Sequence, residues 1–467
     1  MISYQEFLAR KHTRLAKSGF EIPLLEINQK LFDWQREIVR WAVRCGRAAL
    51  FEDCGLGKTA QQLEWARLVV QKTNGRILLL CPLAVQWQTK REAGKFGIDS
   101  QVQVNVVESQ PEVQDGISIT NYEKLHHFDT SQFVGVVLDE SSILKAYTGA
   151  TKRALCERFA NTPYKLACTA TPAPNDRMEL GNHSEFLGVM PSDDMLARWF
   201  INDGGKAGTY RLRKHGERDF WRWMASWSVC ISSPADLGFD AGGFDLPDLV
   251  TIEHVIDCKA ESGYLFAVPR AVSATSVHRE KRAYLDERAD VVAGLVNNDT
   301  DCWAVWCDTD YESDALMDRI PDAVEVRGSH SERIKEDRLR AFSDGKARVM
   351  ITKPEIGGFG LNWQHCHKTT WFAGYSYERF YQSLRRLWRY GQTQDVEVHV
   401  IRTVNEGSIV ETIERKRRQH EEMQREMAGL MGDGMREELG FGNQPRKYVA
   451  EHTGNVPTWL KRKEYVA

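Results

Sequence analysis

The sequence predicts an α/β protein with two lobes, each built on a parallel β-sheet with crossover helices. Apolar runs of strand length alternate with helical stretches in two separate regions of the chain. A Gly- and Pro-containing stretch, 238–247, separates the regions and is expected to be a linker. The runs are 48–51, 77–81, 117–120, 133–138 and 164–168 in the first region, and 302–307, 324–326, 347–352, 369–372 and 396–401 in the second.

A chain of 467 residues is too long for one hydrophobic core, which favours two or three domains. Between the two sheets we expect an insertion, about 177–235, that is rich in Trp and Arg. Its tryptophans could stack on bases, but a small helical subdomain whose tryptophans fill its own core is favoured because Trp is usually buried. The expected divisions are an N-terminal extension 1–30, a first lobe 31–245 that includes the insertion, a second lobe 246–430 with a charged helix at 409–427, and a tail 431–467.

Composition limits the partners and the location of the protein. The net charge of −3 gives no overall basic surface, so nucleic acid would have to bind in a local cleft. The ten cysteines show neither C-x-x-C pairs nor zinc spacing, and we expect free thiols in a reducing compartment. The sequence has no apolar run of 18 residues and no signal peptide, which favours a cytoplasmic protein without membrane contact.

Residues 52–59, Glu-Asp-Cys-Gly-Leu-Gly-Lys-Thr, have the pattern of a phosphate-binding Walker A loop. An apolar strand precedes them and a helical stretch follows, so backbone N–H groups point at one polyanion near a helix N-terminus. Lys58 is expected to reach the β- and γ-phosphates and Thr59 to bind Mg²⁺, although Glu52 replaces the usual first glycine. The loop predicts binding of a nucleoside triphosphate. Its expected contacts are Gly55, Leu56, Gly57, Lys58 and Thr59.

Two carboxylates follow the apolar run 133–138, at the end of a strand where α/β proteins bind ligands. Asp139 is expected to hold Mg²⁺ directly or through water, and Glu140 to polarise an attacking water molecule. A solvated acidic turn is the alternative interpretation. The loop upstream favours the functional one.

Gln382, Arg386 and Arg389 are spaced by four and three residues, which places them on one stripe if the segment is helical. Two converging guanidinium groups repel each other unless an anion lies between them, and a γ-phosphate is such an anion. The alternative is a solvated basic helix face. Two weaker signals are Gln35, whose amide can pair with adenine, and the glycines of 357–362, which permit close approach to a phosphate.

In order and identity, these segments resemble the superfamily-two helicases and translocases, most closely the Swi/Snf-type branch and the helicases of phages and prophages. The resemblance covers roughly residues 20–420 and implies two tandem RecA-like lobes that use ATP and Mg²⁺. The segments that carry it are 32–35 (Q motif), 52–59 (I), 81–83 with Trp87 (Ia), 120–122 (Ib), 139–140 (II), 169–172 (III), 303–308 (IV), 358–362 (V) and 382–392 (VI).

The resemblance implies an ATP-dependent helicase or translocase, with DNA favoured as its nucleic acid and the host cytoplasm as its location if it is phage-encoded. Ser142 stands where family members commonly carry Asp or His, which leaves strand separation open. The implied catalytic residues are Lys58, Glu140, Arg386 and Arg389, with Gln35, Asp139 and Gln382 also at the nucleotide. The implied nucleic-acid contacts are Thr120, Asn121, Tyr122, Thr169, Thr171, Gly360 and Asn362.

Three alternatives stay open at this point. A duplex translocase would move along DNA without separating its strands. A non-catalytic clamp would bind ATP and DNA without turnover. A motor subunit would supply movement to a nuclease, restriction or replication partner on another chain, because residues 430–467 carry no nuclease motif.

Overall fold

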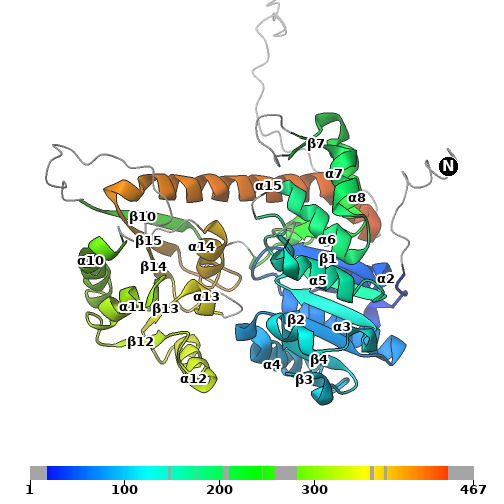
Figure 1. Ribbon diagram of the computed structural model, residues 1–467, viewed down its shortest axis with the longest axis horizontal. Helices are drawn as coiled ribbons and strands as arrows, with labels where there is room; N and C mark the ends of the chain where they lie inside the picture. Colours follow the sequence, from blue (N-terminus) through cyan, green and yellow to red (C-terminus); the bar gives the residue numbers. More distant parts are fainter. Residues whose placement is uncertain are drawn as a thin grey trace, which may run out of the picture.

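The computed structural model describes residues 18–145, 149–174, 176–202, 210–244, 246–257, 281–357, 362–372 and 376–439. Two sheets lie side by side, each with its own helices, and one long helix runs across both (Figure 1). Every strand pair within these two sheets is parallel. The predicted α/β class, with two RecA-like lobes, is confirmed.

The first lobe has seven strands in the order β3-β4-β2-β5-β6-β1-β9. Its central strands are mostly apolar and almost entirely buried, because helices cover both faces of a parallel sheet. The strands are β1 (Arg47–Glu52), β2 (Ile77–Cys81), β3 (Val104–Val106), β4 (Ile117–Asn121), β5 (Gly135–Asp139), β6 (Tyr164–Cys168) and β9 (Ser228–Ile231). The helices are α2 (Asp33–Cys45), α3 (Lys58–Thr73), α4 (Gln86–Phe96), α5 (Ala150–Arg158) and α6 (Leu180–Leu187).

The second lobe has six strands in the order β10-β15-β14-β11-β13-β12. In the two parallel sheets, three described strands were not predicted. β3 and β9 are only three and four residues long, and β10 is an edge strand with exposed residues of both polar and apolar type. The strands are β10 (Leu249–Ile256), β11 (Trp303–Trp306), β12 (Ala323–Val326), β13 (Val349–Thr352), β14 (Lys368–Phe372) and β15 (Val396–Thr403). The helices are α10 (Leu285–Asn297), α11 (Asp310–Met317), α12 (Glu332–Ser343), α13 (Pro354–Gly357) and α14 (Tyr377–Leu384).

The Trp-rich insertion forms part of the core of the first lobe. Trp199, Trp221 and Trp227 are 4%, 0% and 0% exposed, and the Trp199 and Trp223 ring centroids are 4.6 Å apart. The tryptophans are therefore buried as expected, but in the core of the first lobe rather than in a core of their own. The insertion ends in β9, which pairs with β1 and so adds a strand beside the phosphate-binding loop. Its elements are α7 (Ser192–Trp199), the antiparallel pair β7 (Phe200–Asn202) and β8 (Tyr210–Leu212), and α8 (Glu217–Ala225).

A single helix, α15 (Gly407–Leu439), joins the two lobes. It leaves the second lobe after β15 and packs its C-terminal half against α8 and β9 of the first (Figure 1). The Gln424 amide donates to the backbone oxygen of Ala170 at 3.2 Å, and Arg177 forms an ion pair with Glu426. We expected the helix at 409–427 and a tail from 431, but it continues to Leu439 because Met435 and Leu439 are buried against the first lobe.

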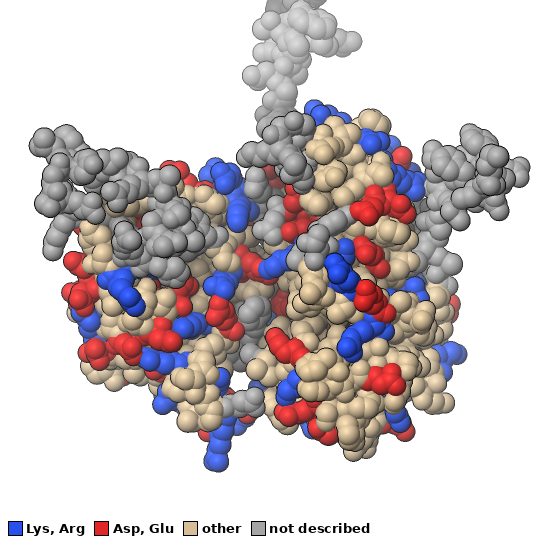
Figure 2. Space-filling model, viewed as in Figure 1, with Lys and Arg blue, Asp and Glu red and all other residues tan. Residues whose placement is uncertain are grey.

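The surface carries no single dominant charge. On the face drawn in Figure 2, acidic and basic side chains are interspersed over both lobes. Within the described ranges, every cysteine is a free thiol, as predicted. No helix among the described residues is both long enough and apolar enough to cross a membrane.

Candidate nucleotide site between the lobes

The phosphate-binding loop connects β1 to α3, and its glycines are required by their surroundings. Gly55 and Gly57 have φ values of +90° and +79°, a region that glycine adopts without strain. A Cβ on Gly57 would lie 2.5 Å from the amide nitrogen of Gln35, and one on Gly55 would lie 2.9 Å from the backbone nitrogen of Tyr390. The loop is thus enclosed by α2 on one side and by the second lobe on the other.

Two charged groups lie at the base of this loop. The Lys58 ammonium donates to the backbone oxygens of Glu52 and Asp53 at 2.8 and 3.1 Å. The Glu52 side chain is fully buried, with Oε2 accepting from the Gln61 amide at 2.7 Å and Oε1 without a hydrogen-bond partner. Burial raises the pKa of Glu52 to about 7, although Lys58 and Gln61 act to lower it. Glu52 therefore carries a pH-dependent cost to stability.

We expect Glu52→Gln to change the pH dependence of stability. In the native state Glu52 keeps its proton from its ordinary pKa of 4.5 up to about 7, so its contribution to the free energy of unfolding falls as pH rises through that window. This pKa shift corresponds to about 3 kcal/mol of lost stability, and a neutral amide at position 52 does not have this cost. Urea unfolding at pH 5 and pH 8 measures the effect: the variant should gain stability relative to the parent at pH 8. An equal difference at both pH values would contradict this.

The two predicted carboxylates lie at the carboxyl end of β5, beside the loop. The Gln62 amide donates to Asp139 Oδ1 at 2.8 Å, and the Thr169 hydroxyl donates to Glu140 Oε2 at 3.4 Å. Glu140 has a φ of +55°, a conformation that non-glycine residues adopt at a cost, often at functional sites. Burial, and then the neighbouring Asp139, raise the pKa of Glu140 to about 7, while Lys58 and Arg386 oppose the rise.

The second lobe supplies two arginines to the same cleft. Arg386 is 4% exposed, and its Nε donates to the backbone oxygen of Gln382 at 3.0 Å. Burial lowers the pKa of Arg386, and the charges of Glu140 and Asp139 act against this. A Cβ on Gly55 of the phosphate-binding loop would lie 3.4 Å from the Cβ of Arg389, so this segment adjoins the loop. Burial and then Arg386 lower the pKa of Arg389 to about 10, so the two arginines repel each other as expected. The cleft therefore brings Lys58, Asp139, Glu140 and the two arginines together.

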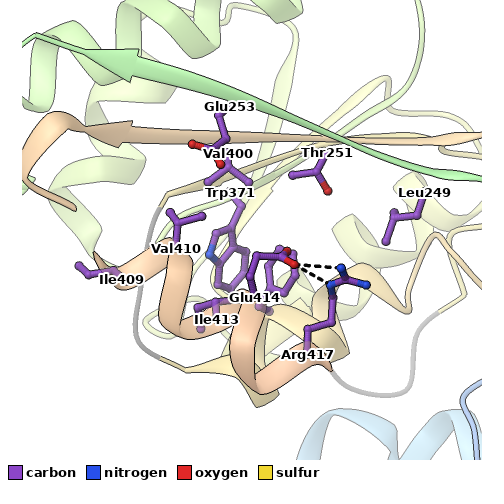
Figure 3. A pocket seen from close by; sticks show the side chains of 11 residues that line it. Leu249, Thr251, Glu253, Trp371, Val400, Ile409, Val410, Ile413, Glu414 and Arg417 are labelled. Atoms are coloured by element: carbon purple, nitrogen blue, oxygen red, sulfur yellow. Dashed lines mark hydrogen bonds and ion pairs between the residues drawn. The ribbon is translucent and has the colours of Figure 1, made fainter. Parts of the chain in front are cut away.

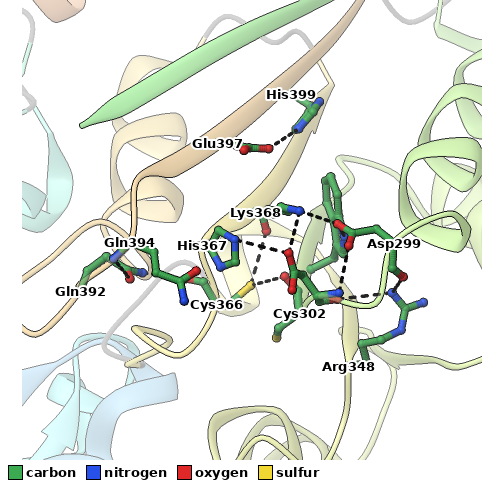
Figure 4. A network of polar contacts seen from close by, with 12 residues as sticks. Asp299, Cys302, Arg348, Cys366, His367, Lys368, Gln392, Gln394, Glu397 and His399 are labelled. Atoms are coloured by element: carbon green, nitrogen blue, oxygen red, sulfur yellow. Dashed lines mark hydrogen bonds and ion pairs between the residues drawn. The ribbon is translucent and has the colours of Figure 1, made fainter. Parts of the chain in front are cut away.

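The expected single helical stripe is corrected by the structure. Helix α14 ends at Leu384, so Gln382 lies in the helix and the two arginines lie in the turns that follow. Hydrogen bonds to other parts of the lobe shape these turns: Gln392 Nε2 donates to the backbone oxygen of Cys366 at 2.9 Å (Figure 4). The backbone oxygen of Arg386 accepts from the nitrogen of Trp363 at 2.9 Å. The arginines converge through the turns rather than through helical periodicity.

Gln35 is built into the phosphate loop. Its Nε2 donates to the backbone oxygen of Leu56 at 2.8 Å, and its Oε1 accepts from the backbone nitrogen of Phe32 at 3.0 Å. In this arrangement the side chain supports the loop from α2. Beside it, the Phe244 and Tyr390 rings stack at 4.3 Å between centroids. These two aromatics were not predicted, because one lies in the expected linker and the other follows the arginines.

The residues predicted to contact nucleic acid divide into two groups. Thr120 and Asn121 are 0% and 2% exposed, and the Tyr122 hydroxyl donates to the backbone oxygen of Asp139 at 2.6 Å, so 120–122 supports the carboxylates. Thr169 and Thr171 are also buried, with Thr169 directed at Glu140. Asn362 is exposed, whereas Gly360 lies outside the described residues.

Ser142, the position that departs from the family pattern, contacts the second lobe. Its hydroxyl donates to Glu378 Oε1 at 3.3 Å, and Lys145 forms an ion pair with the same carboxylate. Glu378 lies in the first turn of α14. The segment after the carboxylates is therefore linked to the helix that leads into the arginines.

The residues present fit a nucleoside triphosphate with Mg²⁺. Three buried or half-buried cations, Lys58, Arg386 and Arg389, suit a triphosphate, and Asp139 offers the hard oxygen that Mg²⁺ prefers. Among the described residues, no group of three His, Cys, Asp or Glu side chains could hold a metal ion. In proteins, Mg²⁺ takes one or two carboxylates and completes its shell with water and phosphate oxygens.

A separate cavity of about 300 Å³ lies in the second lobe, under the start of α15 (Figure 3). Apolar side chains from α15, α14 and the edge of the sheet form its walls, with the Glu414–Arg417 ion pair at one side. None of the residues of the nucleotide site lines it. The cavity is thus separate from the candidate nucleotide site.

Comparison with known proteins gives partial matches. Human DNA excision repair protein ERCC-6-like is 26% identical over 185 residues, which is 34% of this chain and 15% of that protein. DNA repair protein RAD5 of Yarrowia lipolytica is 25% identical over 180 residues, 32% of this chain and 17% of that protein. The matches thus span less than a fifth of these relatives.

The structure of the Sulfolobus solfataricus SWI2/SNF2 ATPase core in complex with dsDNA matches with a TM-score of 0.41 and 16% identity. That match covers 89% of this chain and 98% of the other. Residues 34–222 match the model of the family described as SNF2-related domain. This segment includes the phosphate loop and both carboxylates, so the part of the chain that supplies Lys58, Asp139 and Glu140 is similar to an SNF2-related domain.

Proposed function

We propose that the protein is a DNA-dependent ATPase that moves along DNA, an SNF2-type translocase. The observation that carries the proposal is that the loop of Lys58 meets the arginine segment of the second lobe, where a Cβ on Gly55 would lie 3.4 Å from the Cβ of Arg389. The charges of Lys58 and Arg386 both act on Glu140 there. A clamp that only binds ATP has no need for a base opposite an arginine. The DNA repair proteins among the relatives support DNA as the nucleic acid.

Each residue has a distinct task in this proposal. Lys58 and the loop amides bind the β- and γ-phosphates, and Mg²⁺, held by Thr59 and Asp139, would neutralise phosphate charge. Glu140 accepts a hydrogen bond from the attacking water and orients it. Arg386 and Arg389 stabilise the negative charge that develops on the transferred group. Because these arginines belong to the other lobe, hydrolysis is coupled to the relative position of the lobes.

The contacts around Glu140 give a route for this coupling. Thr169 donates to Glu140, and the adjacent Ala170 accepts a hydrogen bond from Gln424 of α15. Ser142 reaches Glu378 of α14 from the same strand end. Loss of the γ-phosphate would thus change two contacts between the lobes. The resulting motion of the lobes would shift a nucleic acid that both lobes hold by its phosphates.

ATP turnover measured with duplex DNA, single-stranded DNA and RNA tests the proposal. We expect duplex DNA to stimulate the parent most, with a stimulation that falls as salt rises, because phosphate contacts release counterions. Lys58→Ala should show no turnover, whereas Lys346→Ala, which breaks an exposed ion pair with Asp344, should match the parent. Turnover that ignores all three nucleic acids, or that survives in Lys58→Ala, would contradict the proposal.

Translocation without strand separation is the form we favour over unwinding. Ser142 replaces the residue that usually links the carboxylates to the threonine segment, and it contacts Glu378 of the second lobe instead. Displacement of a triplex-forming strand, alongside displacement of a fluorescent strand from a duplex, distinguishes the two.

A requirement for a nuclease or replication partner would appear as DNA cleavage or processive movement only when that chain is added.

A further inference from the structure

A second buried contact crosses the cleft, next to the site described above. Asp53 of the phosphate loop forms an ion pair with Arg385 and accepts a hydrogen bond from the Tyr381 hydroxyl, both from the second lobe. The side chains of Arg385 and Asp53 are 4% and 11% exposed. None of these three residues was predicted as a site residue.

The contact is fully satisfied by protein groups. Asp53 Oδ1 also accepts from the backbone nitrogen of Cys54 at 2.6 Å. The Arg385 guanidinium donates to the Tyr381 hydroxyl at 3.3 Å and to the backbone oxygen of Trp388 at 3.1 Å, and lies 4.7 Å from the Trp388 ring centroid. Because both charges belong to protein side chains, this contact does not depend on a phosphate.

The position of the contact links it to the catalytic groups. Asp53 lies within the loop, and its backbone oxygen accepts from Lys58. Arg385 immediately precedes Arg386, and Tyr381 immediately precedes Gln382, whose oxygen holds Arg386 Nε. Fixing Arg385 and Tyr381 against the loop therefore fixes the direction from which Arg386 enters the cleft.

We propose that Asp53, Tyr381 and Arg385 form a latch that holds the second lobe against the phosphate loop and positions Arg386 before ATP arrives. The positioning part rests on the proposed function; the closing part does not. Breaking a buried ion pair leaves a charge without its partner, which is unfavourable in the protein interior. Since each lobe has its own sheet and core, we expect the lobes to relieve that charge by moving apart and admitting water.

The closing part is tested on the full chain without nucleotide, by amide hydrogen exchange and small-angle X-ray scattering. In Arg385→Met we expect faster exchange at residues 53–58 and 377–384 and a larger radius of gyration than in the parent. Tyr381→Phe keeps the ring and loses only the hydroxyl, so it should show a smaller change in the same segments. Arg379→Met is the matched control, because it breaks an ion pair with Glu355 from the same helix but within the second lobe.

Parent-like exchange and scattering in both Arg385→Met and Tyr381→Phe would overturn the latch. If Arg385→Met does not fold, Tyr381→Phe alone tests the latch, because it keeps the buried aromatic ring and removes only its hydroxyl group. These readouts use no ATP, so a response in a protein without turnover would refute the proposed function and leave the latch standing.

The positioning part is tested by ATPase kinetics. If the closed state falls to about one tenth of its population, the KM for ATP should rise about tenfold in Asp53→Asn and Arg385→Met. Arg385→Lys keeps the charge without the fork geometry and should lie between Met and the parent. kcat should fall as well, because the Arg386 guanidinium is less precisely positioned against the transferred phosphoryl group. Unchanged kcat and KM in all three variants would exclude the positioning role.

Discussion

Replacing Arg386 with Ala should lower kcat for ATP hydrolysis by about 10³- to 10⁵-fold, the range found for arginines that stabilise a transferred phosphoryl group. The reason is that Arg386 is a second-lobe cation whose charge acts on both Asp139 and Glu140. KM should change much less, because Lys58 and the loop amides keep their contacts. Steady-state phosphate release with saturating duplex DNA measures both constants.

Arg379→Ala provides the control for this prediction. Arg379 lies on α14, one turn before the site, and its ion pair with Glu355 is half exposed. It should keep the kcat of the parent. If Arg386→Ala retained a tenth or more of the parent kcat, the cleft would not use this arginine for chemistry.

Glu140→Gln should abolish turnover while leaving ATP bound. The amide has the same shape and fits the same half-buried position beside Thr169, but it cannot accept a proton from water. Loss of a positioned general base costs about 10²- to 10⁴-fold in rate. A fluorescent ATP analogue in equilibrium titration should give a Kd similar to that of the parent, since the phosphate contacts are unchanged.

Lys58→Ala serves as the opposite case in the same titration. It should weaken nucleotide binding, because it removes the cation in the loop, whereas Glu140→Gln should weaken only turnover. A Glu140→Gln variant that hydrolyses ATP at the rate of the parent would show that another residue activates the water.

The sequence predicted the strands that are apolar and central. β2 and β5 are continuous apolar runs, and such runs are typical of parallel strands covered on both faces. β9 and β10 were missed for opposite reasons. β9 is a four-residue strand inside the Trp-rich insertion, and β10 is an edge strand whose exposed positions carry Thr251 and Glu253. Neither gives a local signal strong enough to set it apart from a loop.

The residues of the candidate nucleotide site have local sequence signatures, whereas those of the proposed latch do not. Lys58 follows a glycine turn, and Glu140 follows a buried strand, so each has a signature within a few residues. The Asp53–Arg385 pair joins positions 332 apart and depends on how two lobes meet. A signal did exist: Arg385 is an extra cation beside two predicted arginines, in a segment otherwise rich in Leu and Trp.

The predicted nucleic-acid contacts were less accurate, because a sequence motif identifies residues but does not show whether their side chains are exposed. The segment 120–122 resembles a nucleic-acid contact, yet it lies at the end of the interior strand β4. Its Tyr122 hydroxyl donates a hydrogen bond to the backbone oxygen of Asp139. The end of α14 depends on a long-range contact between Gln392 and Cys366, which helical spacing alone does not reveal.

The structure of the Glu140→Gln variant with ATP, Mg²⁺ and duplex DNA, determined by electron cryomicroscopy, tests the central claim most directly. We predict that the Lys58 ammonium and the Arg386 guanidinium both lie within about 3 Å of oxygens of the same γ-phosphate. A bound nucleotide that contacts Lys58 while Arg386 and Arg389 remain turned away from its phosphates would contradict the account.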